Sequence, residues 1–141
     1  MPFVPPPTSA AWSHQDARSG FEVVHVQPVD NGHLLTGATA AVEDGQSWIV
    51  DYEIRVDAGW HTRSARVTGR SNTGSRTQLL EGDGERLWHI DGEPAPQLDG
   101  CHDVDLESSA MTAPAFDFSC QLVYDEAGLV LAYTGIAVRA A

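Results

Sequence analysis

The sequence predicts an all-β fold, in which an antiparallel meander of strands curls into a roll or barrel with little or no helix. Runs of alternating apolar and polar residues recur along the chain, and turn-forming residues separate them. No window has the spacing of an amphipathic helix. The longest alternating run, residues 48–56, exceeds an ordinary strand. Because long antiparallel strands twist and coil, we expect a wrapped sheet rather than a flat one.

The chain length of 141 residues fits a single domain that is large enough to bury a core. Residues 1–11 are rich in proline, so we expect a flexible, extended arm there. Residues 12–141 are then expected to form one β-roll domain. Near its start, residues 13–19 are compatible with a short helical turn.

The first two strands are expected over residues 21–26 and 33–42, joined by a tight turn at Asp30-Asn31-Gly32. Asn-Gly adopts a positive φ at low cost, which suits such a hairpin. The second strand is rich in small residues, among them Gly37 and Ala38. Small side chains in mid-strand leave room for a neighbouring group. We favour a crowded sheet corner over a bound ligand as the reason for them.

The next strand pair, residues 48–56 and 60–69, combines the clearest pattern in the chain with an unusual one. The run 48–56 places its apolar side chains on one face of the strand. In the run 60–69, alternation puts His61, Arg63 and Ala65 on one face, and neither face is plainly apolar. Such a strand is expected where a sheet lines a partly polar cavity.

The rest of the chain offers shorter strand candidates, separated by turns such as Gly82-Asp83-Gly84. Residues 108–114 interrupt the series, because they carry no periodic pattern. The candidate strands are residues 76–81, 86–90, 101–107, 116–124, 129–133 and 136–138.

The charge balance excludes some partners. The chain carries 20 acidic residues against 8 basic ones, for a formal net charge of −12 at pH 7. Nucleic acids and anionic membranes are polyanions, so neither is an expected partner. The first residues lack the features of a signal peptide, and no run approaches the ~20 apolar residues of a membrane helix. We therefore expect a cytoplasmic protein without membrane insertion, in which Cys101 and Cys120 are most simply free thiols; pairing between them stays open.

Asp103 and Asp105 are candidates for polar chemistry. They share one face of the strand expected over residues 101–107, and His102 points to the other face. Both carboxylates can meet one ligand or one arginine, and Arg63 is the obvious partner. We favour a structural ion pair over a pair that also holds a polar head group, and both over catalysis. The spacing fits no specific metal site, so no metal and no cofactor are expected.

Aromatic side chains offer faces that suit a sugar or a lipid. They are Trp48, Tyr52, Trp60, Trp88 and Tyr124. Core packing is the favoured role for at least three of the five. Trp60 lies beside a turn and close to Arg63 in sequence, so it is the strongest candidate for ligand contact. Neither a nucleophile motif nor a phosphate-binding glycine loop is present, which counts against an enzyme.

Several segments together resemble the glycolipid-binding family that was formerly a domain of unknown function. The segments are Trp60-His61-Thr62-Arg63, Leu80-Glu81-Gly82-Asp83-Gly84 with Trp88, Leu98-Asp99-Gly100-Cys101, Asp103-Val104-Asp105-Leu106, and the ending Asp125-Glu126-Ala127-Gly128-Leu129-Val130-Leu131-Ala132-Tyr133-Thr134-Gly135. The resemblance covers most of residues 12–139. It implies a spiral β-roll, a long sheet wrapped around one helix, with homodimers and a shape similar to carriers of acyl chains. The family's middle segment, including that helix, has no counterpart between residues 108 and 116.

From the mixed-face strand and this resemblance, we expect the protein to bind an amphipathic small molecule such as a glycolipid in the concave side of a curled sheet. The expected ligand-binding residues are Trp60, Arg63, Asp103, Asp105, Tyr52 and Trp88. Two alternatives stay open. One is a non-catalytic structural module that dimerises without a ligand, and the other is a hydrolase acting on a glycolipid or an ester.

Overall fold

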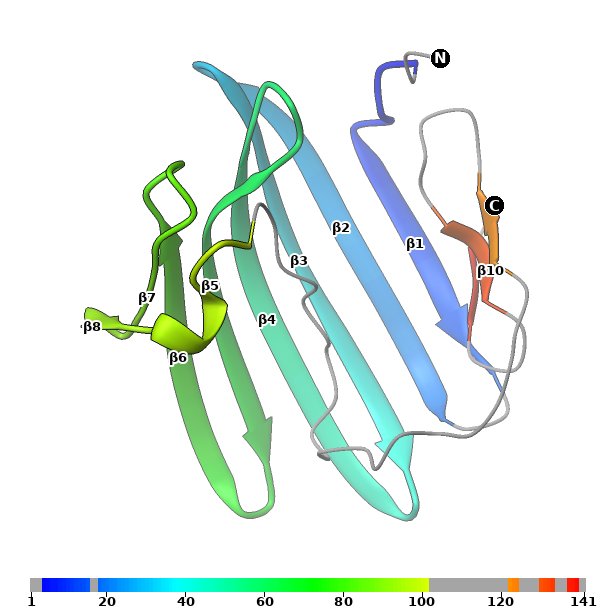
Figure 1. Ribbon diagram of the computed structural model, residues 1–141. Coiled ribbons are helices and arrows are strands. Elements are labelled where there is room, and N and C mark those ends of the chain that lie inside the picture. Colours follow the sequence, from blue (N-terminus) through cyan, green and yellow to red (C-terminus); the bar gives the residue numbers. More distant parts are fainter. Residues whose placement is uncertain (1–3, 16–17, 102–121, 125–129, 134–136, 140–141) are drawn as a thin grey trace.

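The computed structural model describes residues 4–15, 18–101, 122–124, 130–133 and 137–139 of the chain (Figure 1). These ranges form one antiparallel sheet of 11 strands in the order β8-β7-β6-β5-β4-β3-β2-β1-β11-β10-β9. The strands are β1 (Ser9–His14), β2 (Ser19–Val29), β3 (Gly32–Glu43), β4 (Gln46–Asp57), β5 (Thr62–Ser71), β6 (Gly74–Gly82), β7 (Trp88–Ile90), β8 (Glu93–Pro94), β9 (Leu122–Tyr124), β10 (Val130–Tyr133) and β11 (Ala137–Arg139). The expected all-β meander is therefore confirmed.

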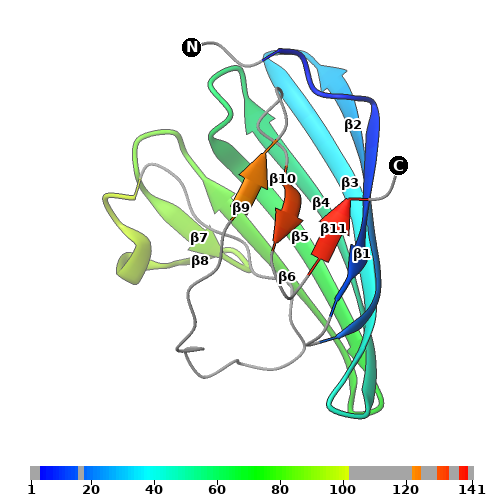
Figure 2. The same ribbon diagram turned by 90° about the vertical axis from the view of Figure 1, so that its right-hand side faces the viewer.

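Helical structure in the described ranges is limited to one 3-10 turn, η1 (Pro96–Leu98). Within those same ranges, no helix is long and apolar enough to cross a membrane. The sheet is curled but open, because the edge strands β8 and β9 do not pair with each other. Figure 2 shows the short strands at both edges standing on the same side of the long strands β2–β4. The structure is thus an open roll and not a closed barrel.

Tight turns explain the long hairpins β2–β3 and β3–β4. Two residues connect β2 to β3, and the second of them, Asn31, has a φ of 63°. Asp44 and Gly45, with φ of 50° and 73°, make the next connection. Positive φ at both Asp44 and Gly45 gives the twist that two-residue hairpins favour, whereas in the β2–β3 turn only Asn31 adopts it; Asn, Asp and Gly all reach such values at low cost. The strands consequently stay in continuous register over their full length.

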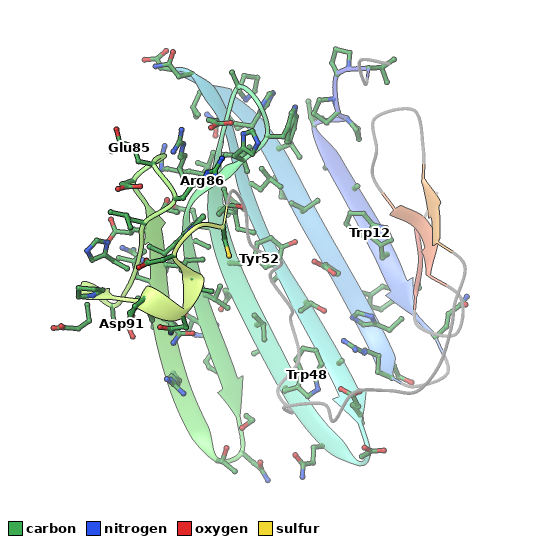
Figure 3. The ribbon with its side chains drawn as sticks, viewed as in Figure 1. Trp12, Trp48, Tyr52, Glu85, Arg86 and Asp91 are labelled. Carbon is green, nitrogen blue, oxygen red and sulfur yellow. The ribbon has the colours of Figure 1, made fainter. Side chains whose placement is uncertain are left out.

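The core lies on the concave face of the sheet. Alternation along β4 sends Trp48, Val50 and Tyr52 to this face, as expected from the sequence. Figure 3 shows Trp12, Tyr52 and Trp48 on the same side of the sheet. Two apolar clusters form there. The first consists of Ala10, Val24 and Val26 with Trp12, Leu35 and Tyr52 against it, and the second of Ala41, Trp48 and Val50 with Val67.

Gly37 shows why small residues are needed in β3. A Cβ atom at this position would lie 2.5 Å from the hydroxyl oxygen of Tyr52 and 2.5 Å from the carbonyl oxygen of Val23. The tyrosine ring therefore crosses β3 at Gly37 and reaches Glu22 on β2, where its hydroxyl donates a 2.8 Å hydrogen bond to Oε1. The room in mid-strand serves the protein's own side chain.

Some boundaries differ from the expectations. The helical turn expected over residues 13–19 is wrong, because Ser13 and His14 belong to β1 and Ser19 begins β2. β1 also includes the last three residues of the expected arm, and Ala10 is buried. The residues of β1, Ser-Ala-Ala-Trp-Ser-His, do not alternate regularly between apolar and polar side chains, so the sequence pattern does not indicate a strand here.

The strand expected over residues 60–69 begins only at Thr62, and its faces differ from the simple alternation. Arg55 pairs with Ser64, whereas Val56 pairs with Thr62, so Arg63 is an extra residue in β5. Such a β-bulge shifts the alternation by one residue. As a result, Thr62 and Ala65 are both buried on the concave face. The strand expected over residues 101–107 and most of the one over 116–124 lie outside the described residues.

Candidate functional site

A pocket of about 150 Å³ lies at one end of the concave face, between the β4–β5 turn and the β6–β7 loop. Thr62 and Trp88 line it, and both belong to the buried, concave side of the sheet. The complete lining is Asp57, His61, Thr62, Arg63, Gly84, Arg86, Trp88 and Cys101. Three separate stretches of the chain therefore meet here.

The β4–β5 turn is held by Asp57. Its Oδ1 accepts backbone hydrogen bonds from Gly59 at 2.9 Å and from His61 at 3.0 Å. The hydrogen bond from the His61 backbone, with that from Gly59 and the charge of Arg63, lowers the pKa of Asp57. Trp60, at the tip of the turn, has a φ of 66°. The carboxylate thus stays ionised and fixes the start of β5.

Arg63 owes its position to the bulge in β5. Its Nη2 lies 3.0 Å from Oδ2 of Asp57, and its side chain is 42% exposed. Since the exposed pair is screened by solvent, its main effect is to orient the guanidinium group rather than to stabilise the fold. The guanidinium group of Arg63 therefore borders the pocket, held by Asp57 through Nη2 and otherwise accessible to water.

The β6–β7 loop is built in the same way around Asp83. Its Oδ1 accepts hydrogen bonds from the backbone of Glu85 at 2.7 Å and of Leu87 at 3.1 Å. These two hydrogen bonds, the Glu85 bond first, lower the pKa of Asp83. Gly84 follows with a φ of 83°, and a Cβ atom there would overlap the guanidinium group of Arg63. The positive φ favours glycine at this position, and any larger residue would displace the end of the Arg63 side chain.

Arg86 stands on this loop, as Figure 3 shows, in a backbone conformation that is unusual for a long side chain, with a φ of 69°. The backbone amide of Gly100 donates a 2.8 Å hydrogen bond to the carbonyl oxygen of Arg86. A further backbone bond, 3.1 Å from the amide of Asp83 to the carbonyl of Leu87, closes the loop. The position of Arg86 is thus fixed from both sides.

Trp88 forms the floor of the pocket and is only 3% exposed. Its Nε1 donates a 3.0 Å hydrogen bond to the carbonyl oxygen of Cys101. This bond brings the segment after η1 to the pocket, although Cys101 follows Trp88 by 13 residues in the sequence. A Cβ atom at Gly82 would lie 2.7 Å from the indole ring, so this glycine gives the tryptophan its space.

A second polar group lies lower on the concave face, next to the apolar clusters. Nε2 of His14 lies 2.8 Å from Oγ1 of Thr39, and Thr39 is fully buried. Burial is the main cause that lowers the pKa of His14, and the charge of Arg18 adds to it. Arg18 also lies 4.0 Å from Glu43 and 5.6 Å from the ring centre of Trp48. The concave face is therefore apolar with polar groups embedded in it.

The structure brings together only part of the residues that the sequence singled out. Arg63 and Trp88 line the pocket. Trp60 lies outside the lining, where its ring stacks on His33 with the centroids 4.3 Å apart, and it is 40% exposed. Tyr52 lies further along the concave face, bonded to Glu22. Asp103 and Asp105 lie outside the described residues, and the partner of Arg63 among the described residues is Asp57.

Sequence reasoning missed the roles of Asp57 and Arg86. Both lie in segments with clear turn signals, and a turn residue is normally explained by the turn alone. The sequence did contain one signal. In two places an aspartate begins a turn and an arginine follows it a few residues later: Asp57 precedes Arg63, and Asp83 precedes Arg86. Within the described ranges, no group of three or more histidine, cysteine or acidic residues could hold a metal ion.

The fold and the pocket together define the class of protein. It is an open β-roll with a pocket at one end of its concave face, and two arginines in the pocket lining supply hydrogen-bond donors. A family model described as "Putative glycolipid-binding" matches residues 9–114, well over half of the 141 residues. The chain belongs to this family. The match ends before the C-terminal stretch that also resembled the family in sequence.

A crystal structure of a DUF1089 family protein from Pseudomonas aeruginosa has a similar fold. The TM-score is 0.60 and the sequence identity 24%, and the comparison covers 94% of this chain and 92% of that chain. This similarity supports the fold alone. No functionally curated protein matches the chain.

Proposed function

We propose that the protein binds an amphipathic small molecule such as a glycolipid. The pocket holds the polar end, and the apolar clusters on the concave face accommodate the chain. The observation that carries the proposal is the position of the pocket: Thr62 and Trp88 belong both to its lining and to the concave face. A ligand with one polar and one apolar end matches this arrangement.

The size of the pocket decides which part of the ligand it can take. An apolar cavity of about 150 Å³ is known to hold a molecule as large as benzene, whereas sites for whole drug-sized ligands measure roughly 300–1,000 Å³. The pocket here has about 150 Å³. It therefore suits a head group, and the remainder of the ligand has to lie along the sheet.

Family membership supports the same class of ligand, because the family description reads "Putative glycolipid-binding". Arg63 and Trp88 keep the ligand-binding role expected from the sequence. Trp60 and Tyr52 are proposed to contact the ligand at the turn and on the concave face. The roles expected for Asp103 and Asp105 stay predictions.

Two neighbouring leucines provide a matched test of the concave face. Leu35 packs against the first apolar cluster, and Leu34 lies on the convex face of the same strand. A fluorescent acyl probe is titrated into the wild-type protein and both variants, and bound lipids are extracted and identified by mass spectrometry. We expect Leu35→Asn to weaken probe binding by about tenfold, as the loss of a buried leucine contact implies. Leu34→Asn serves as the control and should bind the probe as the wild type does.

The proposal fails if the purified protein carries no amphiphile and the probe does not saturate. It also fails if both leucine variants bind the probe equally, provided that circular dichroism shows both to be folded. The concave face would then have no part in binding.

A non-catalytic module that self-associates is the second candidate. It is favoured by exposed apolar side chains on the convex face, where Phe21 is 63%, Val42 47% and Val23 40% exposed. Light scattering over a range of concentrations tests it. A protein that stays monomeric throughout, and whose Phe21→Ser variant behaves identically, is not such a module.

A further inference from the structure

We infer that the pocket selects a single oxyanion, a phosphate, sulfate or carboxylate group, so that the head group of the amphiphile is anionic and not a neutral sugar. The inference rests on the proposed function and narrows its ligand class. Three observations support the inference: the net positive charge of the pocket lining, the hydrogen bonds and ion pair that already engage the Asp57 carboxylate, and the burial of Trp88.

The charge of the pocket is opposite to that of the chain. The chain has 20 acidic residues and 8 basic ones, yet the lining contains two arginines and one aspartate. Leaving His61 aside, the lining thus has a formal charge of +1. Guanidinium groups bind carboxylate and phosphate oxygens through parallel hydrogen bonds, which makes arginine the preferred residue for such groups.

Asp57, the one acidic residue of the lining, is already satisfied by the protein. Its Oδ1 accepts two backbone hydrogen bonds, and its Oδ2 pairs with Arg63. Little acceptor capacity therefore remains for the hydroxyl groups of a sugar. Arg86 differs from Arg63, because it forms no ion pair within the described residues. Its guanidinium group is available to an incoming anion.

Trp88 argues against a neutral sugar as well. Sugar rings are commonly bound by stacking on an open aromatic face. The side chain of Trp88 is 3% exposed, and its Nε1 is engaged by Cys101. The ring can close the floor of the pocket, but it offers no open face for stacking.

The backbone at Arg86 fits the same conclusion. A positive φ at a long side chain is costly, and such strain persists where the surroundings enforce it, often at ligand sites. Here the hydrogen bonds of Asp83 and Gly100 enforce it. The loop thereby holds a second arginine at the same pocket as the first, and among the described residues no carboxylate forms an ion pair with it.

The test compares three probes by calorimetry: inorganic phosphate, dodecyl phosphate and the neutral dodecyl maltoside. Both detergents are used below their critical micelle concentrations. We expect dodecyl phosphate to bind at least about tenfold more tightly than dodecyl maltoside, as one charge-assisted contact implies. Arg86→Asn, which tolerates the positive φ, should remove most of this preference, and Arg63→Gln should do the same. Arg66→Gln on the exposed convex face of β5 is the charge-matched control and should change nothing.

The outcomes separate the two claims. Equal binding of both detergents overturns the oxyanion inference and leaves the proposed function standing. If inorganic phosphate binds as tightly as dodecyl phosphate, and Arg86→Asn abolishes both, the oxyanion site is supported and the proposed amphiphile is not. If none of the three probes binds, both claims fall.

Discussion

Glu22 and Tyr52 form a half-buried, hydrogen-bonded pair on the concave face, and the pKa values of both groups are shifted. Desolvation is the main cause that raises the pKa of Glu22 above its usual value of 4.5, and it also raises the pKa of Tyr52. The hydroxyl of Tyr52 donates to Oε1 of Glu22 at 2.8 Å. At neutral pH the folded protein therefore holds a carboxylate in surroundings that favour its protonated form.

This shift predicts a pH dependence of stability with a definite sign. Because the pKa of Glu22 is higher in the folded than in the unfolded state, its protonation favours folding, and this contribution is lost as the pH rises through the folded-state pKa. Glu22→Gln keeps the acceptor for Tyr52 and removes the charge. We expect the variant to be more stable than the wild type at neutral pH, with a difference that shrinks as the pH falls toward 4.5.

Urea denaturation at a series of pH values measures this difference. Asp57, Asp83 and His14, whose pKa values are lowered, titrate in both proteins and cancel in the comparison. A difference that is constant over the whole pH series would contradict the prediction.

The long hairpins β2–β3 and β3–β4 depend on close approach across β3. Gly37 in the middle of this strand lets the Tyr52 ring reach Glu22, and no larger residue fits there without moving the ring. Gly69 in β5 makes a useful contrast, since the nearest atom to a Cβ there would be Cγ2 of Val50 at 4.0 Å. Two mid-strand glycines on the same face thus have different reasons to exist.

Gly37→Ala should destabilise the protein by about 1–3 kcal/mol, because the added methyl group forces the tyrosine to move. Gly69→Ala should stabilise it by about 0.5–1 kcal/mol, since alanine loses less conformational freedom in a strand. Chemical denaturation of both variants against the wild type gives the two values. The same sign for both would show that the space above Gly37 is unimportant.

Regular alternation explains which elements could be predicted from the sequence. The faces of β4 follow directly from the run 48–56, because no residue is added or lost in its pairing with β3. Arg63 could not be placed this way, since a bulge adds one residue and no local pattern marks it. Arg86 was missed for a related reason: its role depends on a loop that is folded against β5, and only the three-dimensional structure shows that contact.

At the scale of the whole molecule, the net charge of −12 opposes compaction. The arginines reduce this repulsion locally, as Arg70 does by pairing with Asp51 and Arg63 with Asp57. Both pairs are exposed and contribute little to stability by themselves. Long-range repulsion among the remaining carboxylates is therefore a general property of the folded chain.

Added salt should consequently stabilise the protein. Raising NaCl from about 0.05 M to about 0.5 M shortens the Debye length from roughly 14 Å to roughly 4 Å, which screens most of this repulsion. We expect Tm at neutral pH to rise by a few degrees in a thermal scan. The control is the same salt series near the isoelectric point of about 4.6, where the rise should vanish. A Tm that falls with salt at neutral pH would show that attractive ion pairs dominate instead.

The order of strands in the sheet has a consequence for biosynthesis. From β1 to β8, every strand pairs with its neighbour in sequence, whereas the first strand meets the last, with Trp12 opposite Arg139. Local pairings form early and distant ones late. As the chain leaves the ribosome, strands β1 to β8 can therefore pair one hairpin at a time. The edge of β1 that pairs with β11 stays unpaired until β11 has been synthesised. During that interval β1 presents unpaired backbone groups along this edge. The risk of pairing with a wrong strand is therefore highest before β11 is available.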